Sequence, residues 1–81
     1  MVACYTEDQK IRKVLRDLRI RRKLTLKEVG KELNVTKGYI SQIELGKVAI
    51  PKFRVLIALL EVYEVKPKYF EFLLGQGYAK Q

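Results

Sequence analysis

Residues 37–45, KGYISQIEL, place their hydrogen-bonding side chains on one side of a predicted helix. At about 100° per residue, the side that packs holds Tyr39, Ile40, Ile43 and Glu44, and the other holds Lys37, Gly38, Ser41, Gln42 and Leu45. Ammonium, hydroxyl and amide groups can hydrogen-bond to the edges of nucleic-acid bases. The glycine leaves room for a ligand to approach the backbone closely. We therefore expect one side of this helix to pack and the other to bind a ligand.

Catalytic and metal-binding chemistry has little support in the sequence. The chain has no histidine and a single cysteine, Cys4, so neither a histidine base nor a cysteine-rich metal site is available. Carboxylates such as Glu61 and Glu64 fit the solvated face of a helix. We expect neither an enzyme nor a cofactor, no small-molecule ligand, and no redox role for Cys4.

The positive charge is concentrated in one part of the chain. Seventeen Lys and Arg against nine Asp and Glu give a net charge of +8. Eleven of these basic residues and only three acidic ones lie between Lys10 and Lys37, which accounts for the whole excess. Such a localised excess fits a face that displaces counterions from a polyanion, and it also fits a lysine-rich solubilising surface. Charge alone does not choose between these two interpretations.

The apolar spacing and the capping signals predict five short helices and no strand. No Gly or Pro interrupts residues 7–23, which favours a first helix of about four turns with Ile11, Val14, Leu15 and Leu18 inward. Thr25 and Glu28 form the pattern of a capping box before a two-turn helix. Within that helix, Gly30 lies on the buried side, where we expect another helix to pass close. Asn34 suits the end of the helix and Thr36 the start of the next.

The second half of the chain continues in the same way. A loop lies between Gly46 and Pro51, and Pro51 fits the first turn of a fourth helix. The expected core residues of this helix are Phe53, Leu56, Ile57, Leu59 and Leu60. Pro67 opens a fifth helix with Phe70, Leu73 and Leu74 inward, and Gly75 closes it. We expect one all-α domain over residues 1–81, with residues 1–6 flexible and a C-terminal tail at 75–81.

The segment LRDLRIRRKLTLKEVGKELNVTKGYISQIELGK resembles the phage repressor and Cro type of helix-turn-helix domain. The resemblance extends through the loop at Pro51 to Phe70 and Leu74, and it implies a compact five-helix, lambda-repressor-like fold. Helices 2 and 3 form the helix-turn-helix, over about residues 25–45. The implied activity is sequence-specific binding of double-stranded DNA, with helix 3 in the major groove.

The resemblance also implies residue roles. Its candidate base contacts are Lys37, Gly38, Ser41 and Gln42. Its candidate phosphate contacts are Arg19, Thr25, Lys27, Thr36, Tyr39, Lys47 and Lys52. Because an unpaired carboxylate on the packed side of a helix is costly, we expect Glu44 to form a partly buried ion pair, and the family pattern gives Arg19 as its partner.

The implied protein is a prokaryotic or phage repressor or a small controller protein that reads a palindromic operator. We expect a homodimer, because helices 4 and 5 carry more apolar and aromatic residues than one small core needs. The candidate interface residues are Tyr63, Val65, Tyr69, Phe72 and Tyr78. With no secretory signal or membrane span in the sequence, we expect a cytoplasmic, nucleoid-associated protein. The alternative is a protein-interaction module on the same fold, such as an antitoxin or a coactivator-like bridging factor.

Overall fold

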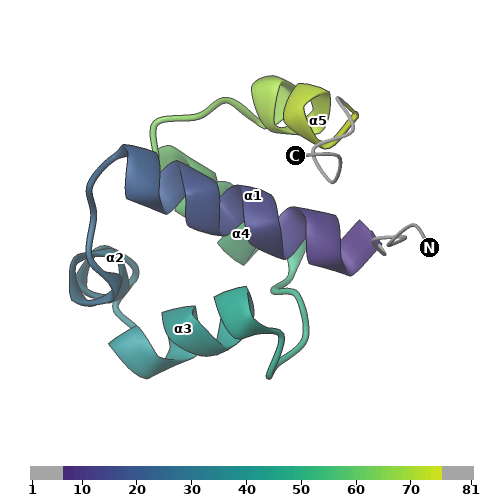
Figure 1. Ribbon diagram of the computed structural model, residues 1–81. Coiled ribbons are helices and arrows are strands. Elements are labelled where there is room, and N and C mark those ends of the chain that lie inside the picture. The colour runs from purple at the N-terminus through teal and green to yellow at the C-terminus, as the bar shows by residue number, and fades with distance from the viewer. Residues whose placement is uncertain (1–6, 76–81) are drawn as a thin grey trace.

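The computed structural model describes residues 7–75, and these residues form five helices without a strand. They are α1 (Glu7–Arg21), α2 (Leu26–Leu33), α3 (Lys37–Leu45), α4 (Phe53–Val62) and α5 (Pro67–Gly75). In Figure 1, α1 crosses the centre of the domain with α4 behind it, α5 on one side and α3 on the other. This arrangement confirms the all-α, five-helix prediction. The expectations for residues 1–6, Cys4, Tyr78 and the last residues of the tail lie outside the described residues.

The start of α2 and the turn to α3 follow from local hydrogen bonds. Thr25 Oγ1 accepts from the Glu28 N–H at 3.1 Å, and Glu28 Oε1 accepts from the Thr25 N–H at 2.8 Å, so the capping box is confirmed. Asn34 ends α2 in the left-handed conformation, with φ 62°. Thr36 then caps α3 by accepting from the Tyr39 N–H at 3.1 Å. The turn between the two helices is thus only three residues long, as predicted.

Gly30 is buried, and the close approach at this position comes from the turn and from the first residue of α3. A Cβ atom at residue 30 would lie 2.7 Å from the Val35 carbonyl oxygen and 3.2 Å from the Lys37 nitrogen. The Val35 N–H donates to the Gly30 carbonyl at 2.8 Å, which holds the turn against α2. The expected neighbouring helix is therefore α3, which approaches Gly30 with its first residue, while the nearest atom belongs to the turn before it. The glycine makes room for the backbone of the turn itself.

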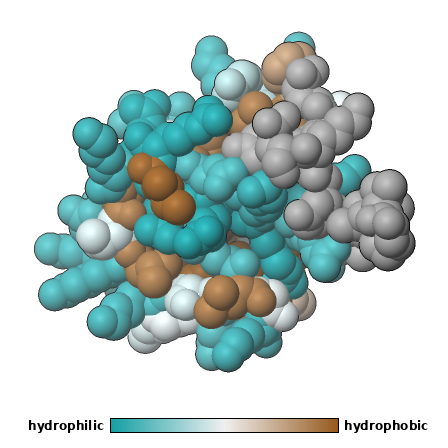
Figure 2. Space-filling view, in the orientation of Figure 1, coloured by the Kyte–Doolittle hydropathy of each residue, from teal (hydrophilic) through white to brown (hydrophobic). Residues whose placement is uncertain are grey.

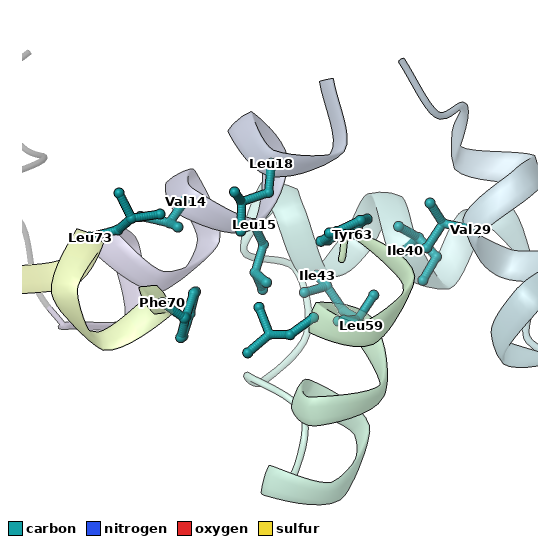
Figure 3. Packing of buried hydrophobic residues seen from close by; sticks show 11 residues of the cluster. Val14, Leu15, Leu18, Val29, Ile40, Ile43, Leu59, Tyr63, Phe70 and Leu73 are labelled. Atoms are coloured by element: carbon teal, nitrogen blue, oxygen red, sulfur yellow. The ribbon is translucent and has the colours of Figure 1, made fainter. Parts of the chain in front are cut away.

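One apolar cluster joins all five helices (Figure 3). Its buried members include Val14, Leu15 and Leu18 of α1, as the spacing predicted. Tyr63 is only 1% exposed and lies among the aliphatic side chains, so its assignment to a dimer interface was wrong. Phe53 is 75% exposed, which corrects its assignment to the core.

The start of the fourth helix differs from the prediction, whereas the first helix agrees with it. The first helix has the predicted length of about four turns, over Glu7–Arg21, and Lys23 after it adopts the left-handed conformation with φ 57°. The fourth begins at Phe53 with Lys52 as its N-cap, so Pro51 lies just before the helix rather than in its first turn. None of the helices within residues 7–75 is long and apolar enough to cross a membrane.

The packing around Gly30 leads to a stability prediction. Gly30→Ala places a methyl group against the carbonyl of a tight turn, and overpacking of this kind costs about 1–3 kcal/mol. That cost outweighs the gain in helix propensity of at most about 1 kcal/mol. We expect urea denaturation to show a lower free energy of unfolding for Gly30→Ala.

Gly38→Ala is the matched control, because the nearest atom to its added Cβ is Thr36 Oγ1 at 3.8 Å. This variant should be as stable as wild type or slightly more stable. If Gly30→Ala is stabilised as much as Gly38→Ala, the turn does not press on residue 30.

Candidate nucleic-acid interface

The amphipathic division of α3 is confirmed by its burial. Ile40 and Ile43 are each 1% exposed and belong to the core. Lys37, Gly38 and Gln42 are exposed, and Ser41 beside them is half-buried. The four candidate base contacts therefore lie on the outward side of one short helix, whose inward side is anchored in the core.

The N-terminal end of α3 favours an approaching anion. Its first turn holds no acidic residue, and Lys37 follows the Thr36 cap directly. The unpaired N–H groups of a first helical turn carry partial positive charge. Gly38 has only the Thr36 hydroxyl near its Cβ position, so the backbone there is open to close contact. The tip of α3 can thus approach a polyanion while its side chains contact bases.

The orientation of α3 is set by an ion pair between Arg19 of α1 and Glu44 of α3. Arg19 Nε donates to Glu44 Oε2 at 2.7 Å, and its NH2 donates to Oε1 at 3.0 Å, so the carboxylate is held by two parallel bonds. The side chains are 13% and 5% exposed, respectively. The hydrogen bond to Glu44 raises the pKa of Arg19 despite the opposing effect of burial. The predicted partly buried pair is present.

Arg19 has a further bond that explains its inward orientation. Its NH1 donates to the Leu24 carbonyl at 2.9 Å, so the guanidinium connects α1, the link before α2, and α3. With all three nitrogens engaged and little of the side chain exposed, Arg19 is a positioning residue. Its assignment as a phosphate contact stays a prediction.

Tyr63 packs close to this ion pair from the end of α4. Burial raises the pKa of the Tyr63 phenol, and the negative charge of Glu44 raises it further. Arg22, the residue directly after α1, donates through Nε to the Tyr63 carbonyl at 2.9 Å, which fixes the end of α4 against the end of α1. Arg19 of α1 therefore holds α3 and the link before α2, and Arg22 just after α1 holds the end of α4.

Arg12 is a positioning residue that the sequence analysis missed. Its NH1 donates to the Ile43 carbonyl at 2.6 Å, near the C-terminal end of α3. Gly46 ends α3 with φ 83°, and the Arg12 side chain lies beside it, 3.7 Å from the position of a Cβ. The spacing in the sequence could have indicated this contact. Arg12 precedes Arg19 by two helical turns, so both arginines lie on the side of α1 that faces α3.

The remaining candidate phosphate contacts are accessible. Lys27 is exposed in the first turn of α2, and Lys47 and Lys52 are exposed on either side of the loop between α3 and α4. Thr25 and Thr36 are exposed, although their hydroxyls cap α2 and α3, and Tyr39 is half-buried. Within residues 7–75, no cluster of three or more Cys, Asp or Glu side chains could hold a metal ion.

The family model of the helix-turn-helix matches residues 15–70, from the middle of α1 into α5. The chain belongs to this family. The match confirms the resemblance to repressor and Cro-type domains. Helix-turn-helix domains of this kind bind DNA, so the match also supports the DNA-binding activity that the resemblance implied. Comparisons with curated proteins and with solved structures gave no significant match.

This helix-turn-helix domain also exposes aromatic side chains far from α3 in the sequence. Tyr69 and Phe72 of α5 are 48% and 56% exposed, and their rings stack with centroids 6.1 Å apart. Exposed Phe53 lines the same groove between α4 and α5 as Leu74. Val65 is half-buried. Of the expected interface residues within 7–75, Tyr69 and Phe72 are exposed and Tyr63 is not, and Phe53 is an exposed aromatic residue that was not expected.

The Arg19 and Glu44 pair gives a direct stability prediction. Glu44→Ala leaves the Arg19 guanidinium buried and without its carboxylate, a change that typically costs about 3–5 kcal/mol. We expect a loss of this size in urea denaturation.

Glu64→Ala is the control. Glu64 is paired with Arg22 at 3.4 Å, but the two side chains are 70% and 46% exposed, so its removal should cost less than about 1 kcal/mol. Equal losses for the two variants would show that burial gives the Glu44 pair no special importance.

Proposed function

We propose that this helix-turn-helix protein is a transcriptional regulator, a repressor or controller protein, that reads double-stranded DNA sequence through α3. The observation that carries the proposal is the outward side of α3. Lys37, Ser41 and Gln42 lie there beside Gly38, on a helix that Arg19 and Glu44 hold against α1. Short polar side chains on a fixed backbone can discriminate between base pairs, because their donors and acceptors keep one geometry.

Each side chain has a chemically suitable base. Gln42 pairs a donor with an acceptor, which suits the N7 and N6 positions of adenine, and Lys37 can donate to O6 and N7 of guanine. Lys27, Lys47 and Lys52 are exposed cations outside this row. They are suited to phosphates, which position the protein without specifying sequence.

We further propose that two copies bind a palindromic operator as a dimer. The support is the exposure of three aromatic side chains, Phe53, Tyr69 and Phe72, which are costly to leave in water. A two-fold dimer would place two copies of α3 about 34 Å apart, the spacing of successive major grooves. A function of this kind places the protein in the cytoplasm, at the nucleoid.

The alternative is a protein-interaction module, and the same exposed aromatic side chains are the observation that favours it. An antitoxin or a bridging factor would use Phe53 and Phe72 to hold a different protein. The oligomeric state of the purified chain separates the two, because only the dimer proposal expects self-association.

Base reading by α3 is tested with Gln42→Ala. On an operator selected from a random duplex pool, we expect this variant to lose about 1–3 kcal/mol of binding free energy and to relax preference at one base pair per half-site. Fluorescence anisotropy against the operator and a scrambled duplex, at two salt concentrations, measures both effects.

Lys52→Ala is the comparison. It should weaken binding to both duplexes alike and lower the salt slope by about one unit. If Gln42→Ala changes specific and non-specific affinity by the same factor, Gln42 does not read a base.

Dimerisation is tested with Phe72→Lys, which places a charge in the proposed interface. Sedimentation equilibrium at tens of micromolar should show a wild-type dimer and a monomeric Phe72→Lys variant. Leu45→Lys is the control, because Leu45 is 65% exposed but lies on α3, outside the interface. A wild-type chain that stays monomeric with and without DNA would exclude the proposed dimer.

A further inference from the structure

A basic hollow lies between α1 and the end of α3. Gln9, Arg12, Lys13 and Arg16 line it from α1, where their spacing places them on one side of the helix. Residues 44–46 close it from α3, and its volume is about 690 Å³. In Figure 2, hydrophilic residues cover most of the outward surface over α1. The hollow thus has polar and basic side chains on its α1 side and Leu45 and Gly46 at the end of α3.

The charge of this hollow is positive: Lys13 is paired with Asp17 at 3.8 Å, and Arg12 and Arg16 add two guanidinium groups. Its one carboxylate, Glu44, is neutralised by two bonds from Arg19. Arg16 is exposed and makes no hydrogen bond or ion pair with any residue in the range 7–75. Arg12 uses NH1 for the Ile43 carbonyl and has further donors on its guanidinium. Two arginines therefore offer donors beside a carboxylate that is already satisfied.

The position of the hollow relates it to the outward side of α3. Leu45 lies three and four residues after Gln42 and Ser41, so it continues the row of candidate base contacts. A helix of nine residues is about 13 Å long, close to the width of a B-DNA major groove of about 12 Å. If the start of α3 lies over the bases, its end at Leu45 reaches the edge of the groove, where the phosphates of the backbone lie.

We infer that Arg12 and Arg16 form a second phosphate-binding site, which takes backbone phosphates of double-stranded DNA at the edge of the groove that α3 enters. The inference rests on the proposed function. Guanidinium groups suit this site because their fork of donors matches phosphate oxygens. Arg12 also bonds to α3, so a phosphate held here ties the DNA backbone to the helix that reads the bases. The site adds affinity without reading sequence.

The test uses Arg16→Gln, because Arg12 also supports α3 and its loss could disturb the fold. We measure the affinity of the full chain for the selected operator at four salt concentrations. Loss of one phosphate contact should lower the salt slope by about 0.9 units and weaken binding roughly three- to tenfold at 0.1 M salt. Base preference should be unchanged, and Arg16→Lys should restore most of the slope.

Arg21→Gln is the matched control. Arg21 is an exposed arginine of the same helix, and its spacing from Arg16 places it on the opposite side of α1. Arg21→Gln removes the same charge and should leave the salt slope equal to that of wild type.

Ethylation interference locates the contact on the DNA. Ethylation of one phosphate at the edge of the groove should block the binding of wild type. Ethylation of the same phosphate should no longer affect the binding of Arg16→Gln. If Arg16→Gln keeps the salt slope of wild type, or loses no more affinity than Arg21→Gln, the site at Arg12 and Arg16 is overturned. Base reading by α3 is unaffected by that result. If wild type binds no duplex, the proposed function and this site both fall.

Discussion

The bond from the Arg19 guanidinium to Glu44 is the constraint on which the DNA-binding surface depends. It joins α1 to α3, and the third nitrogen of Arg19 holds the link before α2 through the Leu24 carbonyl. A buried ion pair adds little net stability over apolar packing, but breaking it is costly. We infer that its main effect is geometric: α3 can pack in only one orientation, because any other leaves the Glu44 carboxylate unpaired.

The outward side of α3 takes its properties from this constraint and from the short turn before it. A turn of three residues fits only because Gly30 lets the Val35 carbonyl lie against α2. The end of α3 is held by Arg12, and its inward side by Ile40 and Ile43 in the core. The side chains that face outward therefore start from a backbone fixed at both ends. Discrimination between bases requires this rigidity, because a mobile side chain can satisfy more than one base.

The sequence was sufficient for features set by local chemistry or by the periodicity of one helix. The Thr25 and Glu28 capping box and the two sides of α3 were predicted from spacing alone, and the partner of Glu44 came from the family resemblance. The errors involve packing between distant segments. Tyr63 follows α4 in a helical conformation that turns it into the core, and Phe53 begins the helix where little packs against it. No periodicity within α4 distinguishes these outcomes, and the contact of Arg12 with Ile43 spans thirty-one residues.

The central claim is that α3 presents its outward side to DNA while α1 holds it in place. NMR titration of the isotopically labelled chain with the selected duplex tests this claim most directly, because every backbone amide reports on its own surroundings. The claim predicts that the largest shift changes fall in residues 37–42 and 46–52, with intermolecular contacts from the Gln42 amide to a base. Changes confined to α4 and α5, with residues 37–42 unaffected, would contradict it.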